Sequence, residues 1–311
     1  MEIISKKGWC SVMDIEEIEK VKKKYALSEE DFKNMYEEVK ETVIGDIKPP
    51  QKQPMGILTG GQPGAGKSSI VIMSRIEFEN EDRKPVILDG DTYRGLYKNS
   101  IKLAKEHPEL YSEITDGATG KIMGMLIEDT INGGYDFIRE GTLNGATIVD
   151  QLLESDKNYN FIIRLMAVCR EESLLCVFER YLAMQRIMGI GRFTAIKAHD
   201  KRYEQFPKTA REQMNKGVEV EVYERTEDRR HPKMIYKSSS PTNEYASMEE
   251  AMNAGRKRSY EKCMQTAKDR LIKIKEDMKE LKIDKSEMLQ QLQVLDNIIN
   301  DAIKNYESLD R

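Results

Sequence analysis

The chain has 311 residues, of which 33% are charged, but its formal net charge at pH 7 is only −4. This balance argues against a general nucleic-acid binder, which carries an excess of basic residues, and no apolar run approaches the roughly 20 residues of a membrane helix. Because the N-terminus lacks a hydrophobic signal region and the four cysteines have no metal-ligand spacing, we expect a cytoplasmic protein in a reducing compartment.

Residues 1–49 are predicted to form an N-terminal helical segment. The stretch Ser28 to Asp31 looks like a capping box, in which polar side chains bond the free N–H groups at the start of a helix. The helix that follows would bury one face, made of Phe32, Met35, Tyr36, Val39 and Val43. We expect a packing helix without chemistry.

A complete phosphate-binding loop comes next, between an apolar run at Met55 to Thr59 and an amphipathic segment that ends near Phe78. Its glycines let backbone N–H groups converge on phosphate oxygens, and the helix start that follows adds a positive dipole end. We therefore predict ATP and Mg²⁺ as ligands, with Lys67 reaching the β- and γ-phosphates and the Ser68 hydroxyl holding Mg²⁺. The predicted nucleotide-binding residues are Gly61, Gln62, Pro63, Gly64, Ala65, Gly66, Lys67, Ser68 and Ser69.

Two further apolar segments deliver polar side chains at their ends. Pro85 to Leu88 is followed by Asp89 and Asp91, and the strand that begins near Tyr135 is followed by Glu140 and Thr142. The carboxyl ends of parallel strands face the ligand crevice, so we expect these groups near the phosphates. A carboxylate there can order Mg²⁺ or accept a proton from an attacking hydroxyl.

Arginines follow the next predicted strand, Phe161 to Cys169. Glu171 to Met188 is predicted to be a helix that bears Arg180 and Arg186, and Gly189 to Thr194 is a glycine-flanked loop that presents Arg192. Glycines relax the backbone of a mobile lid, and guanidinium groups neutralise charge on a moving phosphoryl group. The sequence therefore predicts a lid at Arg192.

Strict alternation over Val218 to Tyr223 predicts a half-exposed strand, with Met234 to Tyr236 pairing beside it. Ser238 to Asn243 reads as a linker. Strands that alternate with helices indicate an α/β fold, a P-loop NTPase-like parallel sheet flanked by helices, over residues 50–240.

Residues 241–311 are predicted to be a helical coiled-coil extension, because apolar residues recur at alternating steps of three and four. The pattern fits one long helix or two helices joined near Ile283 to Ser286. These apolar residues would form one stripe along the helix, which we call the seam. The seam must be buried against a partner helix, the kinase body or another protein. Self-association or a partner helix through residues 259–308 is therefore one expectation.

Together the acids and arginines suggest phosphoryl transfer to a hydroxyl. Asp91 is the candidate base, and Lys67, Arg180 and Arg192 are the candidates for stabilising charge on the transferred group.

The chain resembles the zeta toxins of bacterial toxin–antitoxin systems. The resemblance covers roughly residues 27–240 and rests on an ordered series of motifs. These are the phosphate loop with Lys67-Ser68, Leu-Asp89-Gly-Asp91-Thr-Tyr-Arg94, Gly134-Tyr-Asp-Phe-Ile-Arg-Glu140-Gly-Thr142, Glu179-Arg180-Tyr181, Arg192 to Asp200, and Ile235 to Ser239.

The resemblance implies a toxin that phosphorylates the 3′-hydroxyl of UDP-N-acetylglucosamine with ATP, and a small helical antitoxin that blocks the nucleotide site. It also implies that Asp91 is the base, that Glu140 and Thr142 bind the substrate, and that Arg180 and Arg192 handle phosphates. In one place the chain departs from the family pattern: Gly124 stands where a further glutamate usually meets the sugar, and Glu128, one turn away, is the candidate substitute.

Two alternatives follow from the residues. The first is a P-loop kinase of another small molecule or sugar nucleotide, which the departure at Gly124 allows. The second is an ATP-dependent interaction switch that acts through the C-terminal coil. A base aimed at a second substrate distinguishes the kinase from the switch, which has no need of one.

Overall fold

The computed structural model describes residues 15–107, 110–143, 150, 158–228, 230–284 and 286–309. The chain divides into two compact units. One consists of Met1–Thr42 and Gly90–Met125, and the other of Val43–Asp89 and Leu126–Arg311. The predicted boundaries at residues 49 and 240 stay a prediction.

The first unit is helical. Val21 and Tyr25 pack against Leu103 and Leu110 in its core, and the Tyr97 hydroxyl donates to the Tyr25 carbonyl at 2.7 Å. Its elements are α1 (Ile15–Tyr25), α2 (Glu29–Val43), α4 (Gly90–Tyr93), a 3₁₀ turn (Arg94–Leu96), α5 (Ser100–Glu106) and the first part of α6 (Tyr111–Asn132).

The predicted capping box is confirmed at the start of α2. The Asp31 backbone N–H donates to Ser28 Oγ at 3.1 Å, and the Ser28 N–H donates to the Asp31 carboxylate at 3.4 Å. Met35, Tyr36 and Val39 are buried on the predicted face. Local chemistry therefore accounts for where this helix begins and for the face that it buries.

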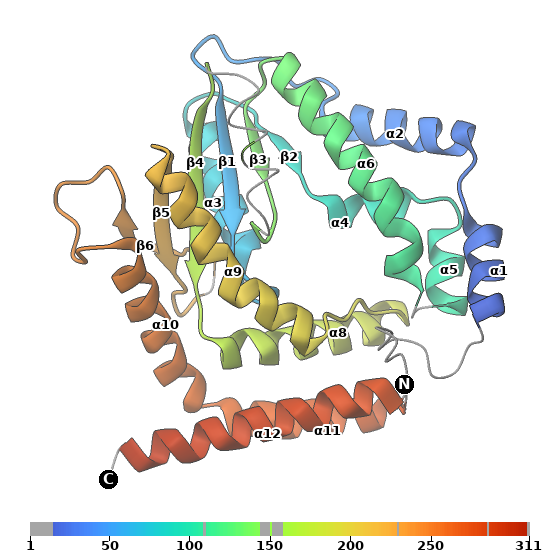
Figure 1. Ribbon diagram of the computed structural model, residues 1–311, viewed down its shortest axis with the longest axis vertical. Helices are drawn as coiled ribbons and strands as arrows, with labels where there is room; N and C mark the ends of the chain where they lie inside the picture. Colours follow the sequence, from blue (N-terminus) through green and yellow to red (C-terminus); the bar gives the residue numbers. More distant parts are fainter. Residues whose placement is uncertain are drawn as a thin grey trace, which may run out of the picture. The chain divides into compact units, whose positions relative to one another are not determined.

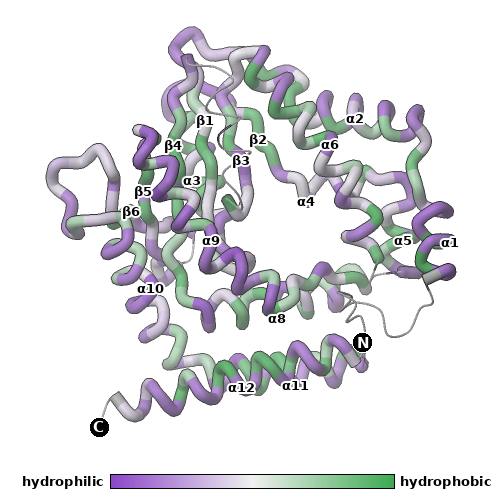
Figure 2. The backbone as a smooth tube through the Cα atoms, viewed as in Figure 1, coloured by the Kyte–Doolittle hydropathy of each residue, from purple (hydrophilic) through white to green (hydrophobic). Residues whose placement is uncertain are grey.

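The second unit contains a six-stranded sheet in the order β2-β3-β1-β4-β5-β6 (Figure 1). The first five strands are parallel, and β6 runs antiparallel to β5. Figure 2 shows hydrophobic residues along β2 and β4, as expected for strands covered on both faces. The strands are β1 (Met55–Gly60), β2 (Val86–Leu88), β3 (Phe137–Arg139), β4 (Asn160–Ala167), β5 (Glu219–Glu224) and β6 (Lys233–Lys237).

Helices cover both faces of this sheet. Residues of α3 pack with Met166 and Tyr223, which are paired across β4 and β5. The next residue of β4, Ala167, points to the opposite face because side chains alternate along a strand, and there it meets Gly255 of α10. The helices of this unit are α3 (Lys67–Asn80), α8 (Arg170–Met188), α9 (Ile196–Asn215), α10 (Met248–Met264), α11 (Ala267–Glu280) and α12 (Ser286–Leu309).

The prediction that β5 is half-exposed is wrong. Glu221, on the polar face of the alternation, is only 3% exposed. Its carboxylate accepts from Arg164 Nε at 2.9 Å and from Lys237 Nζ at 3.1 Å, on the two neighbouring strands. Internal pairing compensates much of the cost of removing these charges from water, so the strand is buried on both faces.

The described part of residues 241–311 forms three helices and not one long one; the predicted seam begins at Met264 at the end of α10 and continues on α11 and α12. α11 ends at Glu280 and α12 begins at Ser286, and the two helices pack against each other and against α8 (Figure 1). The predicted seam is buried with the α8 residues Leu174, Phe178 and Leu182. Burial of the seam therefore requires no second chain. The seam residues in this core are Met264, Ala267, Leu271, Ile274, Met278, Met288, Leu295, Ile299 and Ala302.

None of the helices in the described ranges combines the length and apolar content that crossing a membrane requires.

Candidate nucleotide site

The predicted phosphate loop joins β1 to α3 and adopts a conformation that requires glycine. Gly64 has φ 79° and Gly66 has φ 86°, in the left-handed region. A Cβ at Gly64 would also lie only 2.1 Å from the backbone oxygen of Ser173. The loop is thus packed directly on the first turn of α8.

Lys67 is the first residue of α3, and its Nζ donates to the Gln62 carbonyl at 3.3 Å. The ammonium group therefore lies over the loop that the helix follows. The first N–H groups of α3 add to the positive field at this point, as an anion site requires.

Buried polar contacts hold the Gln62 side chain. Its Nε2 donates to the Val168 carbonyl at 2.9 Å and to Ser173 Oγ at 3.1 Å. Ser173 Oγ in turn lies 2.8 Å from His199 Nε2, and His199 Nδ1 lies 3.0 Å from the Asp200 carboxylate. Because a carboxylate only accepts, Nδ1 carries the proton and Nε2 is the acceptor for Ser173.

Burial lowers the pKa of His199, the charges of Arg170 and Lys67 lower it further, and Asp200 opposes them. Asp200 itself is held by Arg170, at 2.8 and 2.7 Å. The imidazole is therefore neutral at pH 7 and serves as a fixed support behind the loop. The residues alone did not predict this support, because His199 and Asp200 were named only as part of the family motif.

The end of β3 brings a carboxylate to the loop. Ser68 Oγ donates to Glu140 Oε1 at 3.1 Å. β3 is the neighbour of β1, and the Gly141 N–H donates to Thr59 Oγ1 at 3.1 Å, which ties the end of β3 to the end of β1. Both contacts place Glu140 at the same sheet edge as the loop, which is where the strand-end rule put it.

Ser68 and Glu140 fit Mg²⁺, which prefers hard oxygen ligands and usually takes one or two from the protein and the rest from phosphates and water. In the described part of the chain no group of three or more His, Cys, Asp or Glu side chains is arranged to hold a metal ion.

The other predicted site residues lie on several elements. Asp91 is in α4 of the first unit, where its carboxylate is 3.7 Å from Arg94 Nε. Glu128 and Arg180 are exposed on α6 and α8, while Thr142 and Arg192 are partly exposed in loop segments. The roles assigned to these five residues stay predictions.

Arg225 is a site residue that sequence reasoning missed. It follows β5 directly, and its Nη2 donates to the Gly64 carbonyl at 2.8 Å while Nη1 donates to Glu172 at 2.6 Å. The strand-end rule that selected Glu140 would also have found Arg225. It was overlooked because β5 was expected to be a half-exposed strand.

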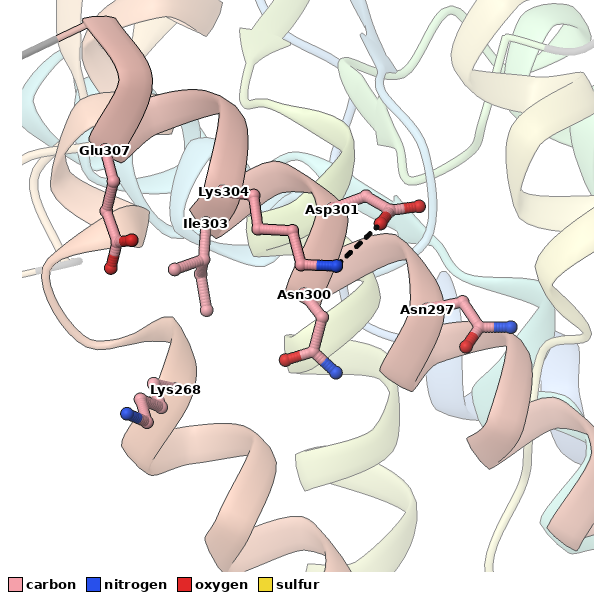
Figure 3. Close-up of a pocket in the computed structure, with 7 residues that line it drawn as sticks. All are labelled: Lys268, Asn297, Asn300, Asp301, Ile303, Lys304 and Glu307. Carbon is pink, nitrogen blue, oxygen red and sulfur yellow. Dashed lines mark ion pairs between the residues drawn. The ribbon is translucent and has the colours of Figure 1, made fainter.

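A pocket of about 470 Å³ lies between α11 and α12 (Figure 3). Its lining is polar, and Lys304 pairs with Asp301 at 3.8 Å. None of its lining residues belongs to the loop or to a strand end. The candidate site is therefore assigned from the loop and not from this pocket. The lining residues are Lys268, Asn297, Asn300, Asp301, Ile303, Lys304 and Glu307.

A family model described as zeta toxin matches residues 40–240. The chain belongs to the zeta toxin family. This confirms the resemblance predicted from the motifs, and the matched region contains the loop, Glu140, Arg180, Arg192 and Arg225.

Two curated relatives in the zeta toxin family match a shorter part of the chain. Toxin PezT of Streptococcus pneumoniae is 34% identical over 137 residues, which are 43% of this chain and 53% of that protein. Toxin zeta of Enterococcus hirae is 28% identical over 152 residues, 48% of this chain and 52% of that protein. The chain thus spans about half the length of the curated relatives it matches.

A solved structure from a study of the PezAT chromosomal toxin–antitoxin system of Streptococcus pneumoniae has a TM-score of 0.66 with this chain. The two are 23% identical, and the match covers 84% of this chain and 100% of the other. The predicted α/β fold, a mostly parallel sheet flanked by helices with further helices at the C-terminal end, is therefore confirmed.

Proposed function

We propose that this zeta toxin family protein is an ATP-dependent kinase that phosphorylates the 3′-hydroxyl of UDP-N-acetylglucosamine. The observation that carries the proposal is the 3.1 Å contact between Ser68 of the phosphate loop and Glu140 at the end of β3. A loop of this kind followed by Lys67 binds phosphates, and a strand-end carboxylate beside its serine belongs to phosphoryl-transfer sites.

The loop and the start of α3 would bind the nucleotide phosphates through backbone N–H groups and Lys67. Ser68 and one oxygen of Glu140 would hold Mg²⁺, which when bound neutralises charge on the β- and γ-phosphates. Glu140, Thr142 and Glu128 would bind the acceptor.

In the transfer step the acceptor hydroxyl oxygen forms a bond to the γ-phosphorus, and the bond between that phosphorus and the bridging oxygen breaks. Asp91 takes the hydroxyl proton, and ADP leaves with the bridging oxygen. Arg180 and Arg192 stabilise the charge on the transferred group, as such a transition state requires.

We also propose that the protein acts in the cytoplasm as the toxin of a toxin–antitoxin pair, with a small helical antitoxin as its partner. Family membership and relatives named as toxins support this role. ATP and UDP-sugars are both available in that compartment.

A different acceptor, another small molecule or sugar nucleotide, is the second candidate because of Gly124. This residue is exposed on α6, and a Cβ added there would meet nothing within 4 Å. The surroundings thus leave room for a side chain that the residue lacks. An interaction switch working through an exposed C-terminal seam is less favoured, because that seam is buried against α8.

The test is incubation of the full chain with Mg-ATP and UDP-N-acetylglucosamine, with products followed by mass spectrometry. We expect one phosphate added to the sugar nucleotide, and loss of that product in Asp91→Asn with ATP binding retained. Bound ATP without product would exclude this acceptor. Unchanged product in Asp91→Asn would remove Asp91 from the role of base.

A further inference from the structure

We propose that Arg225 is a positioning residue for the phosphate loop, and that Arg270 makes helix α11 part of the support of the nucleotide site. The inference rests on the proposed binding of ATP at the loop but not on the identity of the acceptor. It assigns a role to the C-terminal helices, which lie outside the residues matched by the family model.

Arg225 holds the loop at its most constrained point. Its Nη2 donates to the Gly64 carbonyl at 2.8 Å, and a Cβ at Gly66 would lie only 2.9 Å from the same nitrogen. A peptide group whose carbonyl is bonded to a fixed guanidinium cannot turn freely. The N–H groups that bind phosphate are therefore arranged before the nucleotide arrives, which lowers the entropy lost on binding.

Glu172 in the first turn of α8 fixes the guanidinium in turn. Its Oε1 accepts from Arg225 Nη1 at 2.6 Å, and both side chains are largely buried, at 8% and 13% exposure. A planar guanidinium can bond two partners in fixed directions, so Arg225 bridges the loop carbonyl and the carboxylate. A lysine, with one small ammonium group, would not reproduce this bridge.

Arg270 connects the same carboxylate to α11. Its Nη1 pairs with Glu172 Oε2, so that each oxygen of Glu172 has a guanidinium partner. Arg270 also makes a two-bond contact with Glu179 of α8, at 2.6 and 2.8 Å. Loss of Arg270 would leave Glu172 Oε2 without this charged donor and allow the carboxylate to turn away from Arg225.

Arg186 offers a matched control. Its Nη2 also links α8 to α11, with Asp277 at 3.0 Å and Glu280 at 2.9 Å. Within the described residues, the ion pairs of Arg186 involve Asp277 and Glu280 and not Glu172 or the loop, and the Arg186 side chain is 43% exposed. Arg186→Gln therefore removes an ion pair between the same two helices without touching the proposed path.

The experiment is calorimetric titration of the full chain with Mg-AMP-PNP, without any acceptor, for wild type and four variants. We expect Kd to rise about tenfold in Arg225→Gln, since a buried charge-assisted bond is lost. Arg225→Lys should resemble Arg225→Gln, because it keeps the charge but not the bridge. Arg270→Gln should raise Kd about threefold, and Arg186→Gln should leave it unchanged.

Urea unfolding of the same proteins separates positioning from general stability. A merely structural role would lower the unfolding midpoint and the binding stoichiometry while Kd of the folded fraction stayed constant, and this result would overturn the inference. A near wild-type Kd in Arg225→Lys would refute the claim that Arg225 acts by bridging the Gly64 carbonyl and Glu172. Equal changes of Kd in Arg270→Gln and Arg186→Gln would refute the role of Arg270 and α11. Failure of the wild type to bind Mg-AMP-PNP would instead overturn the proposed function, and this inference with it.

Discussion

Gly64→Ala is the substitution whose cost follows most directly from the structure. Gly64 has φ 79°, and holding alanine in that region costs about 1–2 kcal/mol. The new methyl group would lie 2.1 Å from the backbone oxygen of Ser173, which is not the end of a flexible side chain. Moving the loop or the first turn of α8 adds about 1–3 kcal/mol. We expect the free energy of unfolding to fall by about 2–5 kcal/mol.

Gly217→Ala is the control that carries the conformational part of this cost without the close contact. Gly217 has φ 92°, but a Cβ there meets nothing within 4 Å. We expect it to lose only the conformational share, about 1–2 kcal/mol. Both free energies are measured by urea denaturation, and nucleotide affinity is measured by titration with Mg-AMP-PNP. If the two variants were equally stable and bound the nucleotide equally well, the packing of the loop on α8 would be refuted.

Three further predictions test the site and the sheet. Glu140→Gln should weaken binding of Mg-ATP about tenfold but leave binding of ATP in EDTA unchanged, and equal losses in both titrations would contradict a metal role. Burial lowers the pKa of His199 in the folded protein. As the pH falls through about 6.5, the unfolded chain therefore binds a proton at His199 more readily than the folded chain does. The urea midpoint should therefore fall as pH drops from 7.5 to 5.5, and His199→Gln should flatten this fall; equal pH dependence in both proteins would refute the assignment. Glu221→Gln removes the buried charge partner of Arg164, which keeps Glu77 at 2.6 Å, and should cost about 2 kcal/mol, whereas a loss under about 1 kcal/mol, as at an exposed pair, would contradict the burial.

The features that could be predicted from the sequence are those set by neighbouring residues. The phosphate loop is a run of consecutive residues whose conformation follows from its glycines, and the capping box at Ser28 and Asp31 spans one helical turn. Continuous apolar runs predicted β1 and β4, because a strand with apolar neighbours on both faces shows no alternation. The position of Glu140 at the same sheet edge as the loop was expected from one topological rule about strand ends, but its contact with Ser68 was not.

Pairings between distant residues could not be predicted in this way. The alternation in β5 is the same for a strand with one wet face and for a strand whose glutamates are paired internally. Glu221 is buried because Arg164, on β4, and Lys237, on β6, lie beside it. The strand-end rule places Arg225 at the same edge as the loop, but its pairing with Gly64 and Glu172 could not be predicted because these partners lie far away in the chain.

Helix α8 shows how one element can serve two parts of the fold. Its first turn contacts the loop through the Ser173 backbone and holds Arg225 through Glu172, while Leu174, Phe178 and Leu182 pack with the seam of α11 and α12. Any shift of α8 along this apolar contact would move the groups that hold Gly64 and Arg225. Because close-packed interfaces resist small displacements, the C-terminal helices stiffen the support of the loop by packing as well as by the Arg270 contact. Weakening the seam, for example with Leu295→Ala, should therefore raise the Kd for Mg-AMP-PNP as well as lower the free energy of unfolding.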